Sequence, residues 1–200
     1  MGLRDNPYSS QYVEPARGGY LFDSPDAFPA LLEQLCSNHW RGELVGVKGA
    51  GKSTLLTDIL NVLRYEGQSV VRWQIRTDSR FYPVGWWRDL RRAQVLAIDG
   101  GEALLPGLLL FARVVTRLWR KGLLVTAHKP LGLPVQIAVE PNAVALSRKI
   151  FALLGLSPPN DKRISDLARR LNAHNGNARE VLFELYLEAE EAAATPGAST

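Results

Sequence analysis

The chain has 200 residues, of which 46% are hydrophobic and 22% are charged, and its net charge is +4 at neutral pH. This ordinary globular composition allows one sizeable core with a small appendage. The single cysteine, Cys36, excludes an internal disulfide framework and is typical of a reducing compartment. The N-terminus does not read as a signal peptide and no apolar run reaches the length of a membrane span, so we expect a cytoplasmic protein.

Residues 1–23 are predicted to form an irregular N-terminal arm, because prolines and glycines interrupt any regular pattern there. Several aromatic residues argue against a free tail. The arm either packs on the core for stability or closes over a bound adenine. A helix is predicted from Ala27 onward, with Phe28, Leu31, Leu32 and Leu35 on one apolar face.

Residues 46–53 read Gly-Val-Lys-Gly-Ala-Gly-Lys-Ser, which fits the phosphate-binding pattern G-x-x-x-x-G-K-[ST] called Walker A. A buried strand is predicted before it, over 42–47, and a helix after it that ends at Gly67. The glycines allow backbone N–H groups to converge on a polyphosphate, and the helix N-terminus adds positive partial charge.

This loop predicts ATP and Mg²⁺ as the cofactors. Lys52, facing solvent when no ligand is present, is expected to reach the β- and γ-phosphates, and the Ser53 hydroxyl to enter the Mg²⁺ shell. The predicted nucleotide-binding residues of the loop and the first helical turn are Gly46, Gly49, Ala50, Gly51, Lys52, Ser53 and Thr54.

Strands and helices alternate through the next part of the chain. Further strands are predicted over 69–75, 94–99, 123–126 and 135–139, with helices over 86–92 and 108–120 between them. This alternation is typical of a parallel sheet covered on both faces. The predicted fold is α/β, a P-loop NTPase three-layer sandwich with a five-stranded, mainly parallel sheet and a small C-terminal helical lid.

Polar residues follow two of these strands. Asp99 ends the third strand and is expected to act as the Walker B aspartate, holding Mg²⁺ beside Ser53, although a strand-end Asp can also cap a helix. Glu102 either orients the attacking water or merely occupies the first turn of the next helix. At the end of the fourth strand, Thr126 can sense the γ-phosphate, and His128 either helps to position water or is a satisfied structural residue.

Three tryptophans interleave with arginines in the basic middle of the chain, between residues 72 and 92. Such a patch can bind single-stranded nucleic acid by stacking and phosphate contacts. The same pattern also arises when the tryptophans belong to the core and the arginines to a solvated face. Nucleic acid therefore stays open as a partner, and any such binding is expected to depend on salt and to centre on residues 76–92.

Helical patterns alone follow residue 142. Segments 144–154, 164–171 and 178–192 are predicted helices, and Ser-Pro-Pro-Asn at 157–160 marks a boundary between subdomains. The predicted organisation is an arm (1–23), a P-loop core (24–156), a helical lid (157–195) and a disordered tail (196–200).

Together these features resemble an AAA+ ATPase. The run Gly-Asn-Ala-Arg-Glu at 176–180 resembles the family's sensor-2 helix, which implies that Arg179 reaches back to the nucleotide. The arm is similar to the start of the ExeA and TniB-like ATPases. Two features depart from the family: Gly100 follows Asp99 where a catalytic Glu is common, and the short link between the last two strands lacks an arginine finger, for which Lys129 and Arg148 are the nearest substitutes.

The resemblance implies a MgATP-binding domain that hydrolyses ATP, slowly or with a partner's arginine, to drive or gate an interaction with a protein or with a second copy of the chain. Gly100 favours an alternative, a non-catalytic switch controlled by the bound nucleotide. A small-molecule kinase is a third interpretation, since the loop also fits kinases and Arg163, Arg169 and Arg170 could close over phosphates. The chain has no evident acceptor-binding motif to support it.

Overall fold

A computed structural model of the chain describes residues 19–22, 24–75, 84–140, 147, 161–174 and 178–194. Contacts divide the chain into two compact units. The larger unit comprises 22–47 and 51–140 and contains the sheet. The smaller one comprises 1–21, 48–50 and 141–200, and its described helices lie beyond residue 160.

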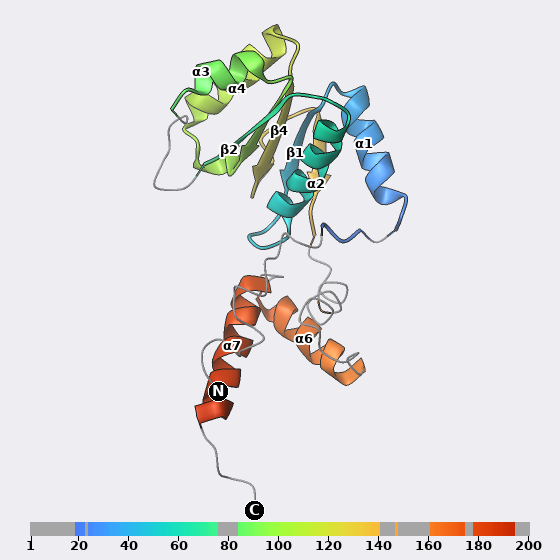
Figure 1. Cartoon of the computed structure of the whole chain (residues 1–200), viewed down its shortest axis with the longest axis vertical. Coiled ribbons are helices and arrows are strands. Elements are labelled where there is room, and N and C mark those ends of the chain that lie inside the picture. Colours follow the sequence, from blue (N-terminus) through green and yellow to red (C-terminus); the bar gives the residue numbers. More distant parts are fainter. Residues whose placement is uncertain are drawn as a thin grey trace, which may run out of the picture. The chain divides into compact units, whose positions relative to one another are not determined.

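The larger unit is built on a five-stranded sheet in the order β2-β3-β4-β1-β5, and every described pairing is parallel (Figure 1). The central strands are continuous apolar runs, because both faces of these strands are covered and neither face has polar side chains directed to solvent. All of β4 is buried, and so is β3 up to its last residue. The strands are β1 (Arg41–Val45), β2 (Val70–Gln74), β3 (Val95–Asp99), β4 (Gly122–Ala127) and β5 (Val135–Ala138).

Helices cover both faces of this sheet, which confirms the predicted α/β layering. Figure 1 shows α3 and α4 on one side and α1 and α2 on the other. One core cluster joins Trp73 of β2 and Ile98 of β3 to Leu90 of α3 and Leu109 of α4. The helices are α1 (Ala27–Ser37), α2 (Lys52–Tyr65), α3 (Trp86–Arg92) and α4 (Pro106–Leu118), with the short 3₁₀ helix η2 (Gly101–Ala103) between β3 and α4.

The predicted bounds of α4 were wrong by two residues at each end. The helix begins at Pro106, whose fixed φ and missing N–H suit the first helical turn. It ends at Leu118, because Arg120 adopts a left-handed backbone with φ of 54°.

The smaller unit contains α6 (Asp161–Ala173) and α7 (Ala178–Ala194), which pack on each other. Both helices are longer than the sequence predicted. His174, after α6, lies 2.7 Å from the carboxylate of Glu184 on α7. The arm up to residue 18, the segment predicted to be a helix over 144–154 (Ser147 apart) and the tail lie outside the described residues. The predicted domain boundaries stay predictions. Within the described ranges, no helix combines the length and the apolar character needed to cross a membrane.

Gly122, the first residue of β4, leaves no room for a side chain. A Cβ there would lie 2.8 Å from the Cβ of Trp40 and 3.0 Å from the Trp40 carbonyl oxygen. We expect Gly122→Ala to lower the free energy of unfolding by about 1–3 kcal/mol, because overpacking forces the backbone apart. Denaturant unfolding measures this change.

The matched control is Gly107→Ala on α4, where an added Cβ meets nothing within 4 Å. Alanine is the better helix former, so this variant should be neutral or more stable by up to about 1 kcal/mol. Equal losses of stability in the two variants would contradict the close approach at Gly122.

Candidate functional site

The Walker A loop connects the end of β1 to the start of α2. Gly49 and Gly51 have φ of 87° and 92°, a left-handed backbone that glycine adopts without strain. The next residue, Lys52, is 8% exposed, and its Nζ donates hydrogen bonds to the carbonyl oxygens of Gly46 (2.7 Å) and Val47 (2.8 Å). The expectation that this lysine faces solvent was wrong, since carbonyls of its own loop hold it.

Burial and two nearby acids act in opposite directions on the Lys52 ammonium group, and burial has the larger effect, so its pKa is lowered. Burial lowers the pKa of its ammonium group, while the carboxylates of Glu102 and Asp99 raise it. These two acids lie on the segment that ends β3 and begins η2, so the lysine lies in the electrostatic field of the proposed Walker B region.

Asp99 lies at the centre of a hydrogen-bond cluster. Its Oδ1 accepts from the Ser53 hydroxyl at 2.9 Å and from the Thr126 hydroxyl at 2.8 Å. Thr126 Oγ1 in turn accepts from the backbone N–H of Gly100 at 2.8 Å. Strands β3, β4 and β1 are neighbours, so their carboxyl ends bring these side chains from distant parts of the sequence to one edge of the sheet.

Arg72 of β2 completes this cluster, a role that the sequence pattern did not predict. Its guanidinium pairs with Asp99 Oδ2 and donates to the Thr57 hydroxyl at 2.9 Å. Both members of the ion pair are mostly buried, with side chains 22% exposed for Arg72 and 12% for Asp99. The strand register explains the Arg72–Asp99 pair. Arg72 pairs with Ala97, two residues before Asp99, so both side chains belong to one face of the sheet.

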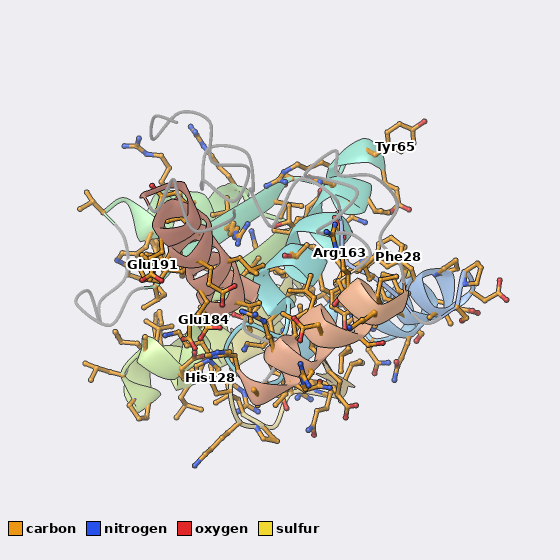
Figure 2. The ribbon with its side chains drawn as sticks, turned by 90° about the horizontal axis from the view of Figure 1, so that it is seen from below. Phe28, Tyr65, His128, Arg163, Glu184 and Glu191 are labelled. Atoms are coloured by element: carbon orange, nitrogen blue, oxygen red, sulfur yellow. The ribbon has the colours of Figure 1, made fainter. Side chains whose placement is uncertain are left out.

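The residue after Asp99 has no space for a side chain. Gly100 has φ of 91°, and a Cβ there would lie 2.6 Å from the carbonyl oxygen of Ile75. The nearest acid beyond it is Glu102 in η2, whose Oε1 lies 3.5 Å from Nε2 of His128. His128 follows β4, is labelled in Figure 2 and is 45% exposed, so this acid–imidazole pair is open to solvent.

The sequence predicted four further residues for this site or its substitutes. Thr54 lies half-buried in the first turn of α2, and Lys129 is exposed after β4. The backbone of Arg179 belongs to the first turn of α7, but its side chain lies outside the described part, as does Arg148. Their roles stay predictions.

The tryptophan and arginine patch divides into a core part and a surface part. Trp73 is 2% exposed and belongs to the core, as expected if the tryptophans have a structural role. Trp87 is 42% exposed on α3, and Arg91 of the same helix lies 5.6 Å above its ring. Residues 76–83, the first part of the segment 76–92 on which the sequence centred nucleic-acid binding, lie outside the described residues.

Comparison with known proteins shows the fold. A crystal structure of a DNA replication initiation factor aligns over 90% of this chain and 64% of its own length, with a TM-score of 0.63 and 12% identity. Replication initiator DnaA bound to AMPPCP and single-stranded DNA aligns with a TM-score of 0.61 at 12% identity over 90% of this chain and 65% of that one. Domain III of DnaA from Thermotoga maritima covers 95% of this chain and 93% of its own length, at a TM-score of 0.60 and 13% identity.

The fold is the α/β fold of these DnaA structures, with a five-stranded parallel sheet. This chain spans less than two thirds of the length of the first two of these structures. No protein-family model matches the sequence, and no curated protein matches it either. Structures at 12–13% identity establish a shared fold and no closer relationship. The resemblance to the ExeA and TniB-like group therefore stays a prediction.

The Arg72–Asp99 pair is expected to stabilise the folded protein. Replacing one partner of a mostly buried pair leaves the other charge without compensation, so Arg72→Met should lower the free energy of unfolding by about 1–3 kcal/mol. Arg64→Met on α2 makes the same chemical change at an exposed position and should cost little.

A double-mutant cycle with Asp99→Asn isolates the pair itself. We expect the combined loss to be smaller than the sum of the single losses by about 1 kcal/mol or more. Strictly additive losses would mean that Arg72 stabilises the protein through packing and not through Asp99.

Proposed function

We propose that this AAA+-like domain binds MgATP and hydrolyses it to drive or gate an interaction with a partner. The observation that carries the proposal is the hydrogen bond of 2.9 Å between the Ser53 hydroxyl and Asp99. These are the two residues that a P-loop ATPase uses around its metal ion, and they come from segments 46 positions apart in the chain.

The donor atoms at this point fit Mg²⁺. The ion prefers hard oxygen ligands and usually keeps several waters, binding through one or two carboxylates and substrate phosphates. Ser53 and Asp99 would hold it, and Arg72 keeps the Asp99 carboxylate in place from the other side. Bound Mg²⁺ would supply positive charge to offset that of the phosphates.

The loop itself fits a polyphosphate. Its two left-handed glycines, Gly49 and Gly51, turn the backbone immediately before α2, whose N-terminus provides free N–H groups. A phosphate would replace the carbonyls of Gly46 and Val47 as partners of the Lys52 ammonium. Two of the similar structures, DnaA proteins, hold the ATP analogue AMPPCP, which supports ATP as the ligand.

Glu102 and His128 are the proposed groups for positioning water. Their contact at 3.5 Å gives an acid beside an imidazole, a pair that can accept and pass on a proton. Thr126 and Arg179 are proposed to sense the γ-phosphate. The partner is a protein or a second copy of this chain, and nucleic acid remains a candidate because one DnaA structure contains single-stranded DNA.

One observation favours a second function, a nucleotide-dependent switch without catalysis. The position after Asp99 cannot hold a glutamate, since Gly100 lies against the Ile75 carbonyl. If Glu102 does not take over that task, ATP stays bound and changes the affinity for the partner without being consumed.

Lys52 gives the direct test of nucleotide binding. Lys52→Ala should remove ATP binding measurable by calorimetry, because the ammonium is the main fixed charge for the phosphates. Lys48→Ala removes the same charge from an exposed position of the same loop and should change affinity by less than about threefold. ATP affinity unchanged in a folded Lys52→Ala protein would end the proposal, and thermal melting without nucleotide confirms that the variant is folded.

Phosphate release from MgATP separates the candidate functions. We expect slow turnover that Glu102→Gln reduces at least about tenfold without weakening ATP binding, as for a group that acts in the chemical step. Glu66→Gln, an exposed change at the end of α2, is the control. Tight binding with no turnover, alone or with added DNA or protein, would support the switch, and loss of ATP only with an acceptor would support a kinase.

A further inference from the structure

A hollow of about 640 Å³ opens at the amino ends of the strands, within the larger unit. Four of its lining residues are cations: Arg41 at the start of β1, Arg117 in the last turn of α4, Arg120 after that helix, and Lys121 before β4. No carboxylate is among the described residues that line it. The hollow therefore concentrates positive charge in a concave surface, which raises the local concentration of anions.

This hollow is separate from the proposed nucleotide site. Arg41 begins β1, and the Walker A loop follows the other end of the same strand. Five residues at about 3.3 Å each separate the two sites by roughly 15 Å. An anion in the hollow thus has its own binding groups and needs none of the Walker residues.

The backbone around the hollow is strained. Among the described residues, the non-glycine positions with positive φ are His39 (55°), Trp40 (57°) and Arg120 (54°). His39 and Arg120 line the hollow, and Trp40 lies between His39 and Arg41. A left-handed backbone at a non-glycine residue costs on the order of 1 kcal/mol, and strained residues of this kind cluster at functional sites.

Arg120 is the most informative of these positions. It follows the end of α4, where helices most often place a glycine because glycine adopts this backbone without strain. An arginine there makes the helix end less stable and adds a cation to the wall of the hollow. Stability alone does not explain that choice of residue.

Two of the cations are held by hydrogen bonds to backbone carbonyls, and two have exposed side chains. Arg41 donates to the carbonyl oxygens of Lys121 (3.1 Å) and Arg113 (3.3 Å), and Lys121 Nζ donates to the carbonyl oxygen of Leu90 at 2.7 Å. Arg117 and Arg120 are exposed. The pKa of Arg41 is lowered by burial and then by its neighbours Arg117 and Arg113, so the cations repel one another and an anion would relieve the repulsion.

We propose that this hollow binds the phosphodiester backbone of single-stranded nucleic acid. Aromatic surface lies beside the cations, which favours a nucleic acid over a small phosphate. Trp119, adjacent to Arg120, is 37% exposed, its ring lies 5.2 Å from that of Trp87, and Lys121 Nζ lies 5.6 Å from its centre. Cations that hold the backbone next to aromatic rings on which bases stack are the general means of binding single strands.

The test uses fluorescence anisotropy of a labelled single-stranded oligodeoxythymidylate, titrated with the full chain at several salt concentrations. The variant is Arg117→Ala with Arg120→Gly. We expect its affinity at low salt to fall at least about tenfold and its salt dependence to become shallower by about 1.4, or about 0.7 for each lost phosphate contact. Because glycine suits the backbone at position 120, the same variant should melt no earlier than the unaltered protein.

The matched control, Arg88→Ala with Arg92→Ala, removes two exposed charges from α3, where the sequence analysis centred nucleic-acid binding. It should retain affinity within about threefold. ATP binding, measured in the same samples, should be unchanged in both variants, so failure of this inference is distinct from failure of the proposed nucleotide site.

Three outcomes would overturn the inference. The unaltered protein does not bind the oligonucleotide, or the hollow variant binds it as well as the unaltered protein does, or the α3 variant alone loses binding. If inorganic pyrophosphate raises the melting temperature of the unaltered protein more than that of the hollow variant, while the oligonucleotide fails to bind, the hollow is a site for small anions instead. Pyrophosphate bound at the Walker A loop would raise both melting temperatures equally.

Discussion

The proposed site depends on the contacts that hold the Asp99 carboxylate in place. One of its oxygens accepts hydroxyls from α2 and β4, and the other pairs with Arg72 of β2. A mostly buried carboxylate is costly unless its lone pairs are satisfied, so three elements must keep their register with β3 for the charge to be tolerated. The same arrangement gives Asp99 a single fixed orientation, which a residue that holds a hydrated metal ion needs.

Gly100, directly after Asp99, affects the proposed chemistry because it has no side chain. Gly100 turns left-handed against the Ile75 carbonyl, which brings its N–H to the Thr126 hydroxyl and fixes that hydroxyl on Asp99. A glutamate in its place would break this contact. The nearest acid in the sequence is instead Glu102, beside His128. A water-activating group at this position is more exposed than a glutamate directly after the aspartate would be.

Much of this arrangement could be predicted from sequence, because buried parallel strands and a glycine-rich loop leave local patterns. The layering, the strand positions and the sharing of one sheet edge by Ser53 and Asp99 all followed from such patterns. The position of Lys52 did not, since its partners are carbonyls that only the folded loop brings near. Arg72 was missed because it belongs to the pattern of tryptophans and arginines over 72–92, which predicts either a nucleic-acid patch or a solvated face. Only the strand register reveals its partner.

The basic hollow could not be predicted, because no segment contains it. The ends of α1 and α4 and the starts of β1 and β4 meet there, and the left-handed turns that join them are formed by His39, Trp40 and Arg120 instead of glycines. Strand β1 runs from this hollow to the Walker A loop and is paired with β4 on one side and β5 on the other. A strand held in two ladders cannot slide without breaking both, and coupling between distant sites requires an element with two arrangements. The sheet therefore offers no movable element between the proposed nucleotide site and the hollow, and any communication between them would pass through the helices.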